Sequence, residues 1–195
     1  MKLLTSCFVV AFAFIAARVN VNISNERTAD SEIAMCGSPS KNASVAADGK
    51  FIHPLSGWGN LHYPISTKSD SAQFYFNQGL SLYYSYHLSE SAASFREASR
   101  FDPSNPMTYW GVALARGPFY NMYYYQMPKD VPGVVADMKK YSSNANNKEK
   151  DLIDALSKRY SEDMSNADRK DLDKNYAGAL ISLSKKYPDD NNIKA

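Results

Sequence analysis

The sequence has little cysteine, little histidine and almost no net charge. Its 2 Cys, Cys7 and Cys36, among 195 residues exclude a disulfide scaffold and a four-cysteine zinc site. The 22 Lys and Arg against 20 Asp and Glu give a net charge of +2, so no electrostatic argument supports a nucleic-acid partner. There is no glycine-rich phosphate loop and no Gly-x-Ser-x-Gly motif. The sequence therefore indicates no particular reaction and no cofactor, and we expect a non-enzyme.

Long hydrophobic runs are also missing, apart from the uncharged stretch 3–17 near the N-terminus. As a helix it would span about 22 Å, less than the ~30 Å hydrocarbon core of a membrane. Lys2 precedes it and Arg18 follows it, a pattern typical of a secretory signal over residues 1–18, cleaved after Ala16-Ala17. The prediction is an exported protein, periplasmic or secreted. The alternative is an uncleaved signal anchor, which would be its only contact with a membrane.

Two regions follow the signal. Residues 19–50 are rich in Ser, Asn, Ala and Asp without an apolar period, which predicts a flexible linker. Residues 51–195 form the predicted folded domain. Aromatic residues make up 13% of the chain, and most of them fall between Phe51 and Tyr125, whereas charges are concentrated towards the C-terminus.

Almost no segment has the alternation of a strand, and helix signals recur along the domain. Caps are expected at Ser69 or Asp70, at Ser89, and at Asn105 before Pro106. The predicted helices cover about 70–87, 89–102, 106–117 and 132–142, and two more follow a capping box of Asn146 with Glu149 and a cap at Ser165. Short connections predict antiparallel hairpins, so the fold class is all-α.

The first hairpin fits the 34-residue tetratricopeptide (TPR) pattern of alternating large and small residues. Large residues at Tyr75, Leu82 and Phe95 would fill the gaps between two helices, and Pro103 would stop the second. Small residues would let the helices approach closely, at Gly79, Ser91 and Ala98. A second unit would begin at Pro106 but is interrupted by Gly117-Pro118 and an aromatic insertion over 119–128.

The motifs GNLHYP, FNQGL, SFREA and YWGVALARGPFYN occur in this order, followed by KEKDLIDALSKRY and YAGALISLSKKYPDDNNI. Over about residues 56–195 the chain resembles an exported TPR family of unassigned biochemistry. The resemblance implies a right-handed TPR-like solenoid of stacked hairpins and no agreed reaction. Members of that family usually carry cysteine where this chain has Asn105, and they continue beyond Ala195, so a truncated version is expected.

Aromatic residues beyond those that the repeat needs suggest a recognition surface, because tyrosine and methionine suit adaptable binding. Tyr83, Tyr84 and Tyr86 follow one another on the first predicted helix, where successive residues point about 100° apart, so they cannot all face the core, and the insertion adds more tyrosines. Polar contacts could come from asparagine and arginine beside them. The candidate ligand-binding residues are Asn77, Tyr83, Tyr84, Tyr86, Arg96, Tyr120, Asn121, Tyr123, Tyr124 and Tyr125. The alternative is that these aromatics only pack across the helical layer.

Two other interpretations stay open. A metal-dependent or other enzyme could use His62 and His87 with Glu90 or Glu97, although no local ligand spacing supports it. The other interpretation is a self-assembling repeat protein that forms a homo-oligomer. Repeat arrays need a capping helix and none is expected after Pro188, so another copy of the chain would cover the open end.

The leading prediction is an exported TPR-type scaffold that binds a protein or peptide through an aromatic-rich groove. The basic residues of the last two helices stand among equal numbers of acidic ones, which predicts a solvent-exposed face. They are Lys148, Lys150, Lys158, Arg159, Lys185 and Lys186.

Overall fold

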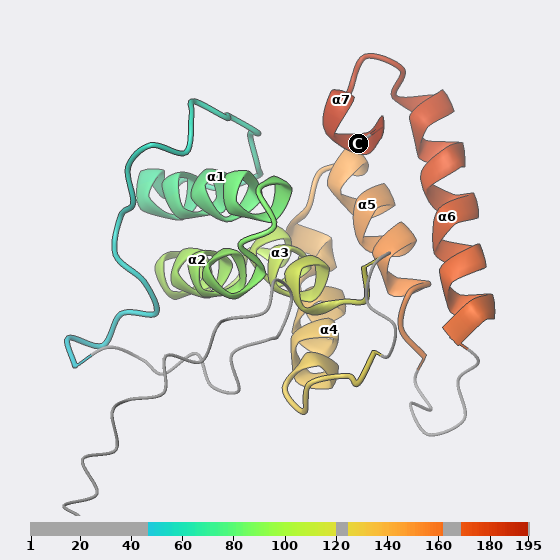
Figure 1. Ribbon diagram of the computed structural model, residues 1–195. Helices are drawn as coiled ribbons and strands as arrows, with labels where there is room; N and C mark the ends of the chain where they lie inside the picture. The colour runs from blue at the N-terminus through green and yellow to red at the C-terminus, as the bar shows by residue number, and fades with distance from the viewer. Residues whose placement is uncertain (1–46, 120–124, 162–168, 195) are drawn as a thin grey trace, which may run out of the picture. The chain divides into compact units, whose positions relative to one another are not determined.

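The computed structural model describes residues 47–119, 125–161 and 169–194, and these residues form helices and no strands. The prediction of an all-α fold is confirmed at this level. Seven α-helices and one short 3-10 helix follow one another (Figure 1): α1 Asp70–Tyr84, α2 Leu88–Phe101, α3 Pro106–Arg116, α4 Val131–Lys140, η1 Ser142–Asn144, α5 Asn147–Ser157, α6 Arg169–Lys186 and α7 Asn191–Lys194. None of the described helices is both long enough and apolar enough to cross a membrane.

Three helices begin at the caps that the sequence predicts. The Ser69 hydroxyl accepts a hydrogen bond from the Ala72 N–H at 3.2 Å, and the Asn105 side chain accepts one from Met107 at 3.0 Å. At α5 the Asn146 side chain accepts the Glu149 N–H while the Glu149 carboxylate accepts the Asn146 N–H, a complete capping box. Local signals therefore determine where these helices start. The predicted cap Ser165 lies outside the described residues.

Other helix ends differ from the prediction. The first helix does not reach His87 but ends at Tyr84, because Tyr86 adopts a left-handed φ of 62°. Its N–H bonds to the Tyr83 carbonyl and the His87 N–H to the Leu82 carbonyl, the pattern of a Schellman cap. The second helix begins at Leu88, with His87 and not Ser89 as the N-cap.

Two further differences concern α4 and the C-terminus. The fourth helix begins one residue before the predicted Pro132 and ends at Lys140, two residues before the predicted Ser142. The expectation of no helix after Pro188 is wrong, since the short helix α7 follows it and buries Ile193.

Helix α3 lies at the centre of the domain. It packs against α2 and α4, its neighbours in sequence, and also contacts α1 and α5. Nine of its eleven residues are buried. Figure 1 shows α1 and α2 side by side, and α5 and α6 side by side.

Phe95 of α2 joins the first three helices. Its ring is fully buried, and it meets the Phe76 ring edge-on at 5.2 Å between centroids. A Cβ atom at Gly79 of α1 would lie 2.8 Å from this ring, and one at Gly111 of α3 would lie 2.2 Å from it. The Ser91 hydroxyl donates to the Gly79 carbonyl at 2.7 Å. The predicted close approach at Gly79 and Ser91 is thus confirmed, and Gly111 extends it to α3.

Residues 51–67, which we call the N-terminal strap, run without regular secondary structure along α1 before that helix begins (Figure 1). Side chains of α1 satisfy its backbone. Gln78 accepts the Leu55 N–H at 2.8 Å and donates to the His53 carbonyl at 3.3 Å. Gln73 accepts the Ile65 N–H at 2.9 Å and donates to the Tyr63 carbonyl at 2.8 Å. The hydrogen bonds that a strand would make to a neighbouring strand are made here to amide side chains.

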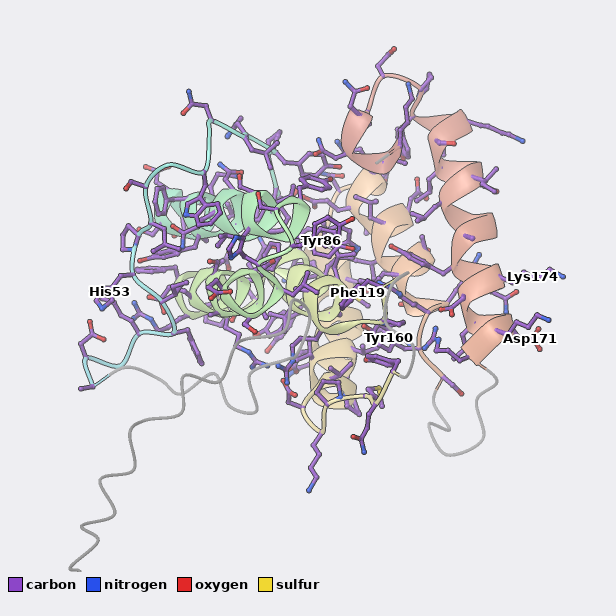
Figure 2. The ribbon with its side chains drawn as sticks, viewed as in Figure 1. His53, Tyr86, Phe119, Tyr160, Asp171 and Lys174 are labelled. Atoms are coloured by element: carbon purple, nitrogen blue, oxygen red, sulfur yellow. The ribbon has the colours of Figure 1, made fainter. Side chains whose placement is uncertain are left out.

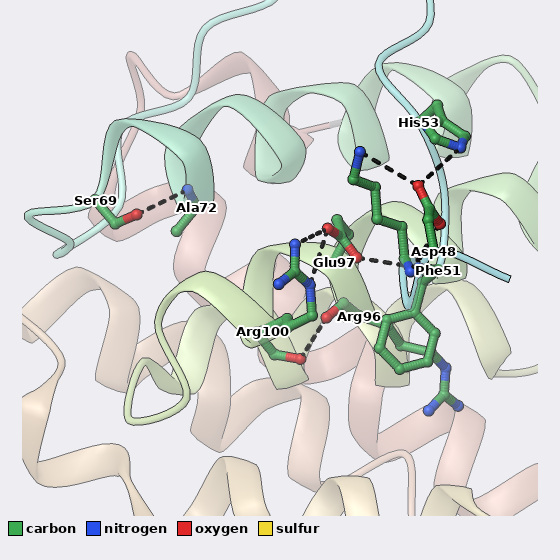
Figure 3. Close-up of polar contacts among 10 residues, drawn as sticks. Asp48, Phe51, His53, Ser69, Ala72, Arg96, Glu97 and Arg100 are labelled. Atoms are coloured by element: carbon green, nitrogen blue, oxygen red, sulfur yellow. Dashed lines mark hydrogen bonds and ion pairs between the residues drawn. The ribbon is translucent and has the colours of Figure 1, made fainter. Parts of the chain in front are cut away.

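Two buried glutamates complete the anchoring of the strap. The Glu97 carboxylate, fully buried on α2, accepts the Phe51 N–H at 3.0 Å and two hydrogen bonds from Arg100, as Figure 3 shows. Glu149 of α5 is 1% exposed and accepts the Ser66 N–H at 2.6 Å. Both buried carboxylates therefore accept hydrogen bonds from groups within the chain, which offsets the cost of burying their charge.

Candidate functional site

Six of the ten predicted ligand-binding residues lie in the described part of the chain. Asn77 accepts the Tyr63 N–H at 3.1 Å and so binds the strap, and Tyr84 donates to the Asn192 side chain of α7 at 3.1 Å. Tyr86 is 54% exposed. The other four, Tyr120, Asn121, Tyr123 and Tyr124, lie outside the described residues.

The two histidines proposed for a metal site have separate surroundings. Nδ1 of His62 lies 3.2 Å from the Asn77 amide nitrogen, and the His87 ring meets Trp58 edge-on at 4.8 Å. Of the carboxylates suggested with them, Glu97 already holds Phe51 and Arg100. Within the described ranges there is no group of three or more His, Cys, Asp or Glu side chains suited to a metal ion.

Tyrosines and arginines from five segments meet where α3 and α5 end. We call this set the tyrosine–arginine cluster: Tyr83, Arg116, Tyr125, Arg159, Tyr160, Arg169 and Tyr176. Two of them, Tyr83 and Tyr125, are among the predicted ligand-binding residues. Figure 2 shows Tyr160 at the C-terminal end of α5.

Gly117 allows the ends of α3 and α5 to come together. A Cβ atom at this position would lie 2.8 Å from the Tyr160 hydroxyl and 2.9 Å from Nη1 of Arg159. The Tyr160 hydroxyl donates to the Ala113 carbonyl of α3 at 2.5 Å. A side chain at Gly117 would push the two groups apart, so glycine is needed here for the close approach and not for its backbone freedom.

Arg159 lies at the centre of the cluster. The residue is 8% exposed, and its guanidinium carbon lies 5.0 Å from the centre of the Tyr176 ring. Its carbonyl accepts a hydrogen bond from Arg169 at 2.6 Å, and Arg169 also stacks over Tyr125 at 5.9 Å and bonds Asp173. The prediction that Arg159 belongs to a solvent-exposed face is wrong, because α3 and α6 cover it.

An ion-pair group borders the cluster. Asp130 accepts hydrogen bonds from Arg116 at 2.8 Å and from Arg96, one of the predicted ligand-binding residues. Burial acts to raise the pKa of Asp130, but the two guanidinium groups outweigh it and hold that pKa below its usual value. Arg96 therefore has a partner inside the protein, and through Asp130 it is connected to Arg116.

Burial raises the pKa of the tyrosines in the cluster. It raises the pKa of Tyr125 to about 12 and that of Tyr176 to about 12, although the nearby Arg159 acts in the opposite direction. Burial also raises the pKa of Tyr160 above its usual range. At neutral pH all three hydroxyls are therefore protonated and can donate hydrogen bonds.

A cavity of about 750 Å³ opens between α5 and α6 next to the cluster. Tyr160 lines it, and Figure 2 places Lys174 on the opposite helix, α6. The remaining lining mixes charged, polar and small apolar side chains: Asp151, Asp154, Ala155, Lys158, Leu172, Asn175, Gly178, Ala179, Ser182 and Leu183. The space is large enough for a peptide segment of a few residues.

Most of the cluster was not found from the sequence. Tyr160 and Tyr176 have the spacing of core positions, and Arg116 and Arg169 stand alone in helices. The one available signal was Gly117-Pro118, which interrupts the repeat pattern where the cluster forms.

Comparison of the chain with known protein families, with curated proteins and with solved structures finds no match.

Proposed function

We propose that this chain is an exported helical scaffold of TPR type that binds a protein or peptide partner at the tyrosine–arginine cluster. The observation that carries the proposal is the convergence of four tyrosines and three arginines beside an open cavity. Tyrosine and arginine are the residues that most often dominate the binding energy of protein interfaces. Both also combine an apolar face with hydrogen-bond donors.

The helix contacts support the stacked arrangement. Alternate helices touch, since α3 contacts both α1 and α5 besides its neighbours in sequence. Stacked hairpins produce contacts of this kind, because the first helix of each hairpin lies beside the first helix of the next. Repeat scaffolds of this architecture use the surface formed across several hairpins for binding, and the cluster draws residues from α1, α3, α5 and α6.

The way in which α1 binds the strap favours a peptide as the partner. Helix α1 already binds an extended segment of the same chain, because the side chains of Gln73, Asn77 and Gln78 accept hydrogen bonds from backbone N–H groups of the strap. The helical surface therefore has the chemistry to bind extended backbone. Since the strap fills that face, a partner would bind at the cluster and the cavity between α5 and α6.

Selection from a random peptide library displayed on phage tests this proposal. We expect enrichment of peptides on the exported domain and loss of their binding in Tyr176→Leu. Tyr109→Leu is the matched control, because Tyr109 lies near the start of α3, where it stacks on Tyr141 and donates to the Pro103 carbonyl, whereas the cluster lies where α3 ends. Failure to enrich any peptide, or equal binding by both variants, would contradict the proposal. Thermal unfolding of each variant checks that it is folded.

The export part of the proposal has its own test. Expression of the whole chain with a C-terminal tag, followed by fractionation and N-terminal sequencing, should give a product that begins shortly after residue 18 and lies outside the cytoplasm. A membrane-bound product that retains Met1 would indicate the signal anchor instead.

A further inference from the structure

Arg159 combines deep burial with an incomplete set of hydrogen bonds. The residue is 8% exposed, and its Nε atom is buried with no hydrogen-bond partner. Among residues 47–119, 125–161 and 169–194, no carboxylate lies within ion-pair distance of its guanidinium. Arginine is almost never this buried without a compensating anion, because desolvation of the charge is costly.

The surroundings of Arg159 carry an excess of positive charge. Four guanidinium groups, those of Arg96, Arg116, Arg159 and Arg169, share two carboxylates, those of Asp130 and Asp173, among the described residues. The carboxylates are bound to the other three arginines. The Nε atom of Arg116 is buried without a partner as well. Two guanidinium groups of the cluster therefore have an unsatisfied donor, and of these two Arg116 has a carboxylate partner, Asp130, whereas Arg159 has none among the described residues.

We infer that Arg159 binds a carboxylate of the peptide partner, at its C-terminus or on an acidic side chain. A guanidinium offers two parallel donors that match the two oxygens of a carboxylate. One guanidinium without an acid partner balances one negative charge, which favours a carboxylate over a doubly charged phosphate. The tyrosine rings at 5.0 Å from Arg159 and 5.9 Å from Arg169 provide apolar walls for the group that carries the carboxylate.

The inference rests on the proposed function for the identity of the ligand, but the site itself follows from the geometry of Arg159. The chain also contains a competitor. Glu162, Asp163 and Asp168 belong to residues 162–168, which lie outside the described part of the chain. The experiment must therefore separate an external carboxylate from these three.

Nuclear magnetic resonance of the arginine Nε–H groups gives a direct readout. The probe is N-acetyl-L-phenylalanine, and N-acetyl-L-phenylalaninamide has the same shape without the charge. We expect the acid to shift the Arg159 Nε–H signal in a saturable way and the amide to bind roughly tenfold more weakly or worse. The Arg100 Nε–H signal should not move, because that atom already donates to Glu97 at 3.0 Å.

Variants complete the test. Arg159→Lys should weaken binding of the acid roughly tenfold or more, whereas Arg100→Lys should leave it unchanged. A triple variant, Glu162→Gln with Asp163→Asn and Asp168→Asn, removes the competing acids. Saturable binding by wild type or by the triple variant alone supports the site, and in the second case the chain's own acids are the competitors.

The inference is overturned if neither protein binds the acid, or if acid and amide shift the signal equally. Tighter binding of inorganic phosphate than of the acid overturns the choice of a carboxylate. Because the peptide selection does not depend on this probe, peptides that bind through Tyr176 while the acid fails would leave the proposed function standing and remove only the carboxylate site.

Discussion

Helices α2 and α6 differ in how many of their residues are buried. Helix α2 has 14 residues and buries seven of them, including the charged Glu97. Helix α6 has 18 residues and buries only Leu183. Between α1 and α2 the approach is so close that Gly79 has no room for a methyl group, whereas a Cβ at Gly178 of α6 meets nothing within 4 Å.

The buried polar groups also differ between two parts of the molecule in how many of their hydrogen bonds are made. Around the strap, the buried carboxylates of Glu97 on α2 and Glu149 on α5 have hydrogen-bond donors within the chain. Where α3 and α5 end, Arg116 and Arg159 each have a buried Nε without a partner. Complete pairing indicates a structural role, and the proposed binding site is the region where pairing is incomplete beside an open cavity.

The largest expected effect on the free energy of unfolding is that of replacing Glu149, whose buried carboxylate binds the strap. Glu149→Ala removes a buried carboxylate that accepts the Ser66 N–H of the strap and supplies half of the capping box of α5, so the N–H groups of Ser66 and Asn146 both lose this acceptor. We expect a loss of about 3 kcal/mol in the free energy of unfolding, measured by urea denaturation. Glu90→Ala, at an exposed position in the first turn of α2, should change it by less than about 1 kcal/mol. Equal losses would remove the distinction between the two kinds of glutamate.

Two glycine substitutions compare the packing of the two sides. Gly111→Ala places a methyl group 2.2 Å from the fully buried Phe95 ring, and we expect it to destabilise the protein by about 2 kcal/mol. Gly178→Ala, in the open middle of α6, should stabilise it by about 0.5–1 kcal/mol because alanine favours a helix. Opposite signs in thermal unfolding would support the comparison, and two changes of the same sign would contradict it.

Alkaline pH should destabilise the cluster. The pKa of Tyr125 and of Tyr176 is raised to about 12 in the folded protein, above the value of about 10 expected when the chain unfolds. Their contribution is fully present below pH 10 and is lost as pH rises from 10 through 12, because only the unfolded chain ionises readily. The free energy of unfolding, measured across this range, should fall less steeply in Tyr176→Phe. Identical slopes would show that Tyr176 is not protected from ionisation.

The smallest expected effect is that of Arg159→Met. Methionine keeps much of the side-chain volume and removes a buried charge whose Nε has no partner. Replacing such a charge by an apolar group is often neutral, so the free energy of unfolding should change by less than about 1 kcal/mol. A loss as large as that of Glu149→Ala, again by urea denaturation, would mean that Arg159 is a structural element and not a binding group.

Sequence signals were sufficient for the features that depend on neighbouring residues. The caps at Ser69, Asn105 and Asn146 lie within three residues of the groups they bind. Asn105 and Asn146 were predicted outright, and Ser69 was one of two predicted alternatives. The end of α1 was missed because a tyrosine, Tyr86, occupies the left-handed position where glycine is the usual signal.

Features built from distant segments could not be predicted in this way. The burial of Arg159 depends on Gly117 and Tyr176, which come from other parts of the chain, while its sequence neighbour Lys158 is exposed. The partners of the strap are likewise spread over α1, α2 and α5, so the sequence placed residues 51–67 in the folded domain but could not identify the side chains that bind them. The tyrosine–arginine cluster could not be predicted for the same reason, because its residues come from segments that are far apart in the sequence.

The strap also constrains the order in which the protein can fold. Its residues are synthesised before those of any described helix, yet the Ser66 N–H needs Glu149, 83 residues later, and the Tyr63 hydroxyl needs Asp190, 127 residues later. Contacts with such long sequence separation form slowly, because the loop between them must first close. The first part of the domain to be synthesised is therefore among the last to reach its final position, and until then the amide side chains of Gln73, Asn77 and Gln78 on α1 are without the strap backbone that they bind in the folded domain.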